Sequence, residues 1–191
     1  MSSVIIDNQA GARAAFEHLH TLGHRRIAFI RGPKMLVDSR ERWMGVRSFA
    51  HDAGIVVDPK MTVELTALYD PTTGFEGGYK LTQELLRRKR PFTAIHAFDD
   101  MTAFGAIRAL GKAKIKVPDE CSVIGFDDVA LAALYAPPLT TIRQPMETMG
   151  VIGVGILLDA ITASRENHAF IPVHRKVAPE LLVRESTKAL G

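Results

Sequence analysis

Two neighbouring carboxylates follow a short, largely apolar segment in the C-terminal half of the chain. Residues 122–126 read Ser-Val-Ile-Gly-Phe and are followed directly by Asp127 and Asp128. Such a run is typical of a strand buried on both faces of a parallel sheet, which places the two acids at its carboxyl end. Ligands of open α/β sheets bind at that edge. Asp127 is therefore the first candidate for a binding site, and the alternative is an Asp that only stabilises its own turn or caps a helix.

Other predicted strands end on polar or aromatic side chains in the same way. One member of the Asp99 and Asp100 pair is expected to cap the helix that follows it. Because the carboxyl ends of parallel strands meet at one edge of a sheet, we expect such side chains to gather there. Besides Asp127, the residues at these strand ends are Asp7, Tyr69, Asp70, Asp99 and Asp100.

Arg42 adds a positive charge to the same edge. It lies in the early turns of a predicted helix, and Gly45 three residues later allows another element to pack closely beside it. Arg40 and Arg42 point to opposite sides of that helix, so one of them is expected to be solvated. A guanidinium, carboxylates and an aromatic ring suit a polyhydroxylated ligand, because the charged groups bind hydroxyls and the ring stacks on a sugar face. A nucleobase would also fit.

Familiar catalytic and metal-binding patterns are absent from the sequence. There is no G-x-S-x-G elbow, no phosphate loop, no G-x-G-x-x-G after a strand and no H-E-x-x-H. His18, His20 and His24 lie close together in sequence, but no carboxylate has ligand spacing to them, so surface histidines are expected and no metal or cofactor is predicted. Asp99 and Asp127 could form an acid/base pair, which leaves a sugar-modifying enzyme open.

The composition is that of an ordinary soluble globular protein. The chain has 191 residues, of which 47% are hydrophobic and 24% charged, with a net charge of +3. The basic run at residues 87–90 ends a predicted helix and is not expected to bind nucleic acid. The single cysteine, Cys121, excludes an intrachain disulfide and is expected in the core, which fits a cytoplasmic location. No secretory signal is visible, and the longest uncharged apolar run, residues 150–158, is too short for a membrane helix.

The elements that must position these side chains alternate between strand and helix. This order predicts a doubly wound parallel sheet with helices on both faces. After Pro145, residues 146–162 predict a helix that is apolar nearly all round and requires burial on more than one side. Ser39 and Thr73 are the expected N-caps of the second and third helices. The predicted strands are residues 4–6, 26–30, 63–65, 93–96 and 122–126, followed by two strand-like runs at 170–173 and 181–183.

Several motifs in this order resemble the effector-binding region of the LacI/GalR family of bacterial transcriptional repressors. They are LGHRRIAFI at 22–30, RWMG at 42–45, DDMTA at 99–103, VIGFDD at 123–128, PLTTIRQP at 138–145 and ELLVREST at 180–187. The resemblance runs from about Val4 to Thr187. It implies a type I periplasmic-binding-protein-like α/β fold, with two subdomains joined by crossover strands and the effector bound in the cleft between them.

The resemblance also implies how the chain divides. Residues of about 9–143 and 168–187 correspond to the C-terminal subdomain, and residues of about 1–8 and 144–167 to a remnant of the N-terminal subdomain. The family's helix-turn-helix DNA reader has no counterpart before Val4, so operator DNA would be bound only through a domain absent from this chain. The helix at 146–162 would lack the sheet on which it packs in the family, and we expect the isolated chain to self-associate or to be unstable.

The family's effector contacts map onto a small set of positions. Gln144 lies at a crossover beside the cleft, and Asp7 is a weaker candidate. The purine-responsive members carry Arg and Thr where this chain has Leu36 and Asp38, so a sugar or sugar derivative is the expected effector. The remaining matched contacts are Arg42, Tyr69, Asp99 and Asp127.

The function implied by the resemblance is the sensing module of a cytoplasmic repressor, in which effector binding changes operator affinity through a population shift. A homodimer or higher homo-oligomer is expected, and no membrane partner. A sugar-binding protein of a transport system shares the fold and stays the alternative, with a sugar-modifying enzyme third. The positions that match the family's dimer surface are Leu131, Leu134 and Tyr135.

Overall fold

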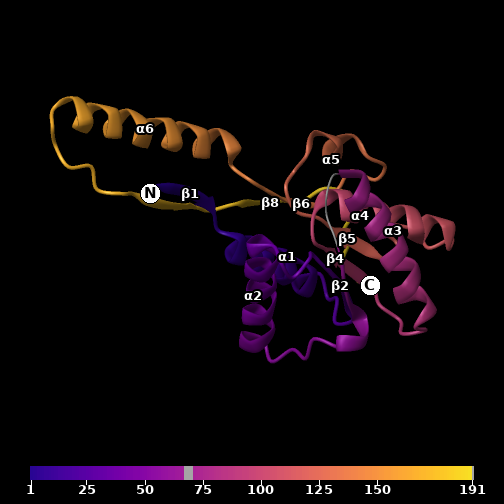
Figure 1. Cartoon of the computed structure of the whole chain (residues 1–191). Coiled ribbons are helices and arrows are strands. Elements are labelled where there is room, and N and C mark those ends of the chain that lie inside the picture. Colours follow the sequence, from indigo (N-terminus) through magenta and orange to yellow (C-terminus); the bar gives the residue numbers. More distant parts are fainter. Residues whose placement is uncertain (67–70, 191) are drawn as a thin grey trace.

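A four-stranded parallel sheet forms the centre of the computed structural model, which describes residues 1–66 and 71–190. The strands lie in the order β3, β2, β4, β5. Helices α1 and α2 cover one face of this sheet and α3 and α4 cover the other (Figure 1). The expected doubly wound architecture is confirmed. The bounds are β2 (Ile27–Arg31), β3 (Thr62–Glu64), β4 (Ala94–Ala97), β5 (Ser122–Ile124), α1 (Asn8–Thr21), α2 (Val37–Asp52), α3 (Pro71–Arg87) and α4 (Asp100–Lys112), with a short 3₁₀ turn, η1 (Pro59–Met61), before β3.

The two faces of the sheet bury two separate hydrophobic cores. Side chains alternate between the faces along a strand, so Ile27 and Phe29 of β2 pack against α1 and α2, whereas Ala28 and Ile30 pack against α3 and α4. Cys121, just before β5, is 1% exposed, and burial raises the pKa of its thiol to about 12. Its expected place in the core is confirmed.

The helices on one face approach each other closely at Gly45. A Cβ atom at this position would overlap the backbone carbonyl of Gln9 on α1. Only glycine leaves room for this crossing of α1 and α2, as the sequence predicted. The crossing fixes the position of the first turns of α2, which carry Arg42.

The first strand, β1 (Ser3–Ile6), lies outside the central sheet. It pairs in parallel with β7 (His174–Val177), far along the chain, so the place in the central sheet that the alternating pattern predicted for it is wrong. The family resemblance had instead assigned residues of about 1–8 to the other subdomain. Local periodicity identifies a strand but not its partner, because pairing is decided by side chains distant in sequence. A further strand, β6 (Thr141–Arg143), pairs antiparallel with β8 (Glu180–Leu182) and runs beside the end of β5 through single bridges.

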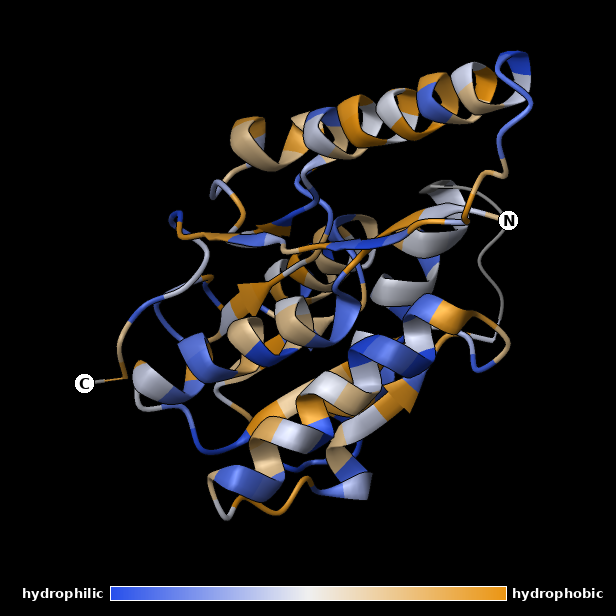
Figure 2. Cartoon of the chain, turned by 90° about the vertical axis from the view of Figure 1, so that its left-hand side faces the viewer, coloured by the Kyte–Doolittle hydropathy of each residue, from blue (hydrophilic) through white to orange (hydrophobic). Residues whose placement is uncertain are grey.

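Helix α6 (Met146–Arg165) projects from the main body beside the β1–β7 ribbon (Figure 1). None of its residues is buried, and apolar residues recur along it (Figure 2). Among the described residues it is the one helix that by length and composition could cross a membrane. The expectation from residues 150–158 that this segment is too short for a membrane helix is wrong as to length, because the helix continues past Asp159 to Arg165. Among its side chains, Val151, Val154, Leu157 and Leu158 are each more than half exposed.

Three local predictions differ from the structure. Helix α2 begins at Val37 and α3 at Pro71, so Ser39 and Thr73 lie inside these helices and are not their N-caps. A turn that joins the Leu36 amide to the Pro33 carbonyl starts α2 early. Residues 170–173 form no strand, and β7 begins at His174. The short helix α5 (Ala130–Leu134) follows β5.

Candidate functional site

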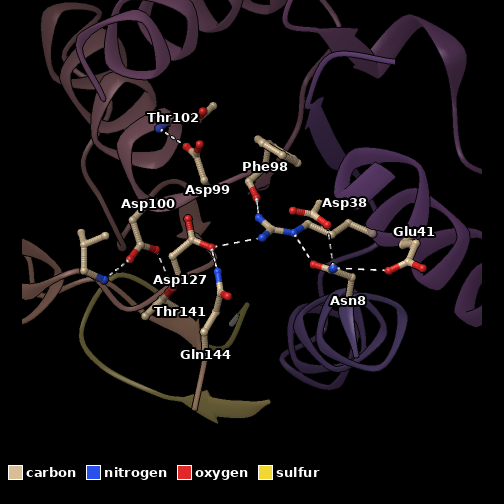
Figure 3. Close-up of polar contacts among 12 residues, drawn as sticks. Asn8, Asp38, Glu41, Phe98, Asp99, Asp100, Thr102, Asp127, Thr141 and Gln144 are labelled. Atoms are coloured by element: carbon tan, nitrogen blue, oxygen red, sulfur yellow. Dashed lines mark hydrogen bonds and ion pairs between the residues drawn. The ribbon is translucent and has the colours of Figure 1, made fainter. Parts of the chain in front are cut away.

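The side chain of Arg42 joins several elements at the carboxyl edge of the central sheet. Its Nε donates to Asn8 Oδ1 at 2.9 Å, Nη1 to the Phe98 carbonyl at 2.8 Å and Nη2 to Asp127 Oδ1 at 3.1 Å (Figure 3). The guanidinium also lies over two aromatic rings, 3.6 Å from the centroid of Phe126 and 4.7 Å from that of Phe98. Arg42 is 8% exposed, whereas Arg40 is exposed as expected for one of the two arginines. Burial makes each of these charged contacts stronger than it would be in water.

Asp127 shares this cluster from the end of β5. Its Oδ1 accepts from Arg42 and from the side-chain amide of Gln144, which lies between β6 and α6. Burial raises the pKa of Asp127, and the charge of Arg42 and the Gln144 hydrogen bond partly offset this effect. Three predicted residues, Arg42, Asp127 and Gln144, are therefore brought together.

Asp99 lies beside the cluster and also has a structural role. Its Oδ1 accepts from the Thr102 amide at 2.7 Å and caps α4, so it is the member of the acidic pair that caps the helix. Its charge contributes to raising the pKa of Asp127. Figure 3 shows Asp99 next to Asp127.

Asp7, another predicted residue, does not belong to this set of contacts. Asp7 caps α1 by accepting from the Ala10 amide at 3.0 Å, and its Oδ1 lies 3.4 Å from Lys176 Nζ. These contacts give Asp7 the role of a helix cap. Tyr69, with Asp70, lies outside the described residues.

Asn8, which the sequence analysis missed, occupies the place expected of Asp7. Its carbonyl accepts from Arg42, and its Nδ2 donates to Asp38 and Glu41 at 3.2 and 3.3 Å. Asn8 is 2% exposed and fixes the orientation of the guanidinium. Its position directly after an acid at a strand end was the available signal.

Asp100, the other member of the acidic pair, was expected at the same sheet edge and lies beneath it. It is fully buried, its Oδ2 accepts from the Val129 amide at 2.9 Å, and its Oδ1 accepts from the Thr141 hydroxyl. Burial raises the pKa of Asp100 to about 7. Its buried carboxyl joins α4 to the segment after β5 and to β6.

Asp128 holds neighbouring segments of the chain together. It forms ion pairs with Arg143 at 2.8 Å and Arg184 at 2.6 Å. Burial by itself would raise the pKa of Asp128, but the hydrogen bonds from these arginines hold that pKa below its usual value. The pairs connect the end of β5 to β6 and to the segment that follows β8.

The histidines near the end of α1 are not all surface residues. His24 is 2% exposed, and its ring contacts the Thr93 and Ser122 hydroxyls and the Lys188 carbonyl. Its expected surface position is wrong because it joins the ends of β4, β5 and the C-terminal segment. Within the described part of the chain, no three His, Cys, Asp or Glu residues are arranged to hold a metal.

The sequence profile of the family described as "Periplasmic binding protein-like domain" matches residues 16–187. The chain is 38% identical, over 100% of its length, to the HTH-type transcriptional regulator DegA of Bacillus subtilis (strain 168), and 32% identical, over 99%, to the HTH-type transcriptional repressor PurR of Histophilus somni (strain 2336). A solved LacI family transcriptional regulator from Enterococcus faecium, with bound ribose, superimposes with a TM-score of 0.83 at 29% identity. The chain belongs to the LacI/GalR family. As a LacI/GalR-family domain it has the periplasmic-binding-protein-like fold that its motifs implied.

The comparisons cover unequal shares of the proteins. The LacI/GalR-family chain spans 53% of DegA and 54% of PurR, about half of each. The superposition on the Enterococcus faecium structure includes 100% of this chain and 67% of that one. These relatives are transcriptional regulators and not enzymes, as expected for this chain. The specific effector does not follow from them.

Proposed function

We propose that this domain senses a small polyhydroxylated effector, a sugar or sugar derivative, for a transcriptional repressor. The observation that carries the proposal is the pairing of Arg42 with Asp127 beside Asp99 at the carboxyl edge of the sheet. Such edges are the usual ligand sites of α/β folds. The ribose in the Enterococcus faecium relative supports a sugar as the ligand class.

The unused hydrogen-bonding capacity of the cluster fits a sugar. A guanidinium has five N–H donors, and the contacts described for Arg42 use three of them. The contacts described for Asp127 and Asp99 all involve Oδ1. A sugar hydroxyl can accept from Arg42 and donate to Asp127 Oδ2, while its neighbour donates to Asp99. Hydrogen bonds to charged groups are stronger than neutral ones, so a pair of adjacent hydroxyls would be held well.

The position of Gln144 provides a route from the effector to the rest of the protein. It binds Asp127 and stands on the connection that leads into α6. A ligand bound at Asp127 Oδ2 lies beside this contact at Oδ1, and it would favour one arrangement of α6 and the β1–β7 ribbon over another. In the whole repressor this bias would change operator affinity, inside the cytoplasm, through its DNA-binding segment.

We also propose a homodimer or higher homo-oligomer, in keeping with the family resemblance. On α5, Leu131 is 44% and Leu134 80% exposed, and Tyr135 stacks on Phe104 with ring centroids 4.5 Å apart. Exposed leucines on one short helix supply the apolar contact that a subunit interface needs. The nearby tyrosine is fixed by the stacking and would support them.

Isothermal titration calorimetry tests the effector site. The chain is titrated with ribose, cellobiose and guanine, and the same titrations are made on Asp127→Asn and on Arg40→Met, an exposed arginine of the same helix. We expect at least one sugar to bind, with affinity reduced about tenfold or more in Asp127→Asn and unchanged in Arg40→Met. Binding of guanine alone would refute the sugar class. Sugar binding that Asp127→Asn leaves unchanged would refute the site.

A further inference from the structure

The segment between β5 and α5 presents Asp127 in an unfavourable backbone conformation. Asp127 has φ of 118° and Asp128 has φ of 56°, both in the region that residues with a Cβ atom rarely adopt. Such a conformation persists only where the surrounding structure fixes it. The direction of the Asp127 carboxylate therefore depends on what holds the two ends of this segment.

Both ends are hydrogen-bonded to the same residue, Asp100. Its backbone amide donates to the Phe126 carbonyl at 2.9 Å, and its Oδ2 accepts from the Val129 amide at 2.9 Å. Phe126 precedes the two acids with positive φ and Val129 follows them. One residue at the start of α4 thus holds the segment on both sides of Asp127.

The same carboxyl also fixes the strand that leads directly to Gln144, a partner of Asp127. Its Oδ1 accepts from the Thr141 hydroxyl on β6, three residues before Gln144 (Figure 3). The backbone passes tightly against this group, because a Cβ atom at Gly125 would overlap Asp100 Oδ1. Asp100 is 0% exposed, so it cannot itself contact a ligand.

We infer that Asp100 is a positioning residue of the effector site, which aims the Asp127 carboxylate at Arg42 and at the ligand through its bonds to Val129 and Thr141. The inference rests on the proposed role of Asp127 in effector binding. Asp128 also holds this segment, through its ion pairs with Arg143 and Arg184. Asp100 differs in that it bonds to both ends of the segment and to β6.

Two substitutions separate the hydrogen bonds of Asp100 from its charge. Asp100→Asn keeps an oxygen that can accept from the Val129 amide and an NH₂ group that can donate to the Thr141 hydroxyl. Asp100→Ala removes both bonds. Thr141→Val removes only the bond to β6 and serves where Asp100→Ala does not fold. Asp119→Ala, an exposed acid paired with Lys188, is the matched control.

The test measures the site without a ligand, so that it stays independent of the calorimetry. Amide hydrogen exchange is followed by NMR at residues 126–129, and the Asp127 carboxyl is titrated by its ¹³C chemical shift. We expect Asp100→Ala or Thr141→Val to speed exchange of these amides about tenfold or more and to change the Asp127 titration, while Asp100→Asn and Asp119→Ala leave both close to the parent chain.

Three outcomes would overturn the inference. Asp100→Ala and Thr141→Val could leave both the Asp127 titration and the exchange of residues 126–129 unchanged. Asp100→Asn could change the amide exchange and the Asp127 titration as much as Asp100→Ala does, which would show that the charge and not the hydrogen bonds matters. Exchange could rise equally throughout α4 and β5, which would indicate a general structural role. If sugars fail to bind while the expected pattern holds, the proposed effector fails and the positioning of Asp127 stands.

Discussion

Removing the Arg42 guanidinium should destabilise the fold more than removing the charge of its partner. Arg42→Met keeps a long unbranched side chain between the Phe98 and Phe126 rings but removes three hydrogen bonds and leaves Asp127 without its cation. Breaking a buried ion pair by removing one partner costs about 3–5 kcal/mol. The Asp127 side chain is 28% exposed, so we expect a loss of about 3 kcal/mol, at the lower end of that range.

Asp127→Asn should cost less. The amide of Asn can still accept one hydrogen bond, and Arg42 keeps its contacts with Asn8, the Phe98 carbonyl and the two rings. We expect a loss of about 1.5 kcal/mol, the lower value for hydrogen bonds to charged groups. The double variant leaves no unpaired charge, so its loss should be smaller than the sum of the two single losses.

Urea unfolding followed by circular dichroism measures these differences, at low protein concentration so that association does not contribute. Arg40→Met is the control, because the side chain is exposed on the same helix and should change the free energy of unfolding by no more than about 0.5 kcal/mol. If Arg42→Met matched the control, or if Asp127→Asn were the more destabilising change, the Arg42 network would not hold these elements together as described.

Three further predictions follow from other parts of the chain. Burial raises the pKa of Asp100 to about 7, above its unfolded value of 3.8, so its contribution to stability is full below about pH 4 and is lost as the pH rises through about 7. Urea unfolding of Asp100→Asn between pH 4 and 7 should show a less negative slope of stability with pH than the parent chain, and equal slopes would contradict the assignment. Lysines at Val154 and Leu158 should reduce the self-association that we expect of exposed α6, as measured by light scattering and binding of a hydrophobic dye, whereas Ser164→Lys should not; a sharp monomer peak of the parent chain without dye binding would argue against the idea. Gly45→Ala should cost about 1–3 kcal/mol in urea unfolding because it forces α1 and α2 apart, whereas Gly111→Ala in α4, where a Cβ meets nothing within 4 Å, should be neutral or stabilising, and similar effects would contradict the close crossing.

The sequence could predict the meeting of Arg42, Asp127 and Gln144 because it rests on local patterns and family motifs. Apolar runs mark buried strands, and the geometry of a parallel sheet then brings their carboxyl ends to one edge. The resemblance to a known family added Gln144, which no local pattern singles out. The positions of these three residues in the fold confirm that part of the expectation, while their role in ligand binding stays a proposal.

Residues whose role depends on burial or on distant partners could not be found in this way. Asn8 and Asp7 are adjacent polar residues, and only the tertiary structure decides which of them turns toward Arg42. Asp99 and Asp100 pose the same problem, since one caps a helix and the other bonds to the segment after β5 and to β6. The pairing of β1 with β7 joins segments about as far apart as the chain allows, and local periodicity carries no information about it.

The reactivity of the buried Cys121 thiol can report how fast the core of this protein opens. Cys121 is the single cysteine of the chain, and both its burial and its raised pKa keep it in an unreactive form while β5 stays in place. With enough alkylating reagent that reaction outpaces closing, alkylation of the native protein should therefore proceed only as fast as the central sheet opens. The rate of that one chemical step would report the kinetic stability of the domain without any introduced label.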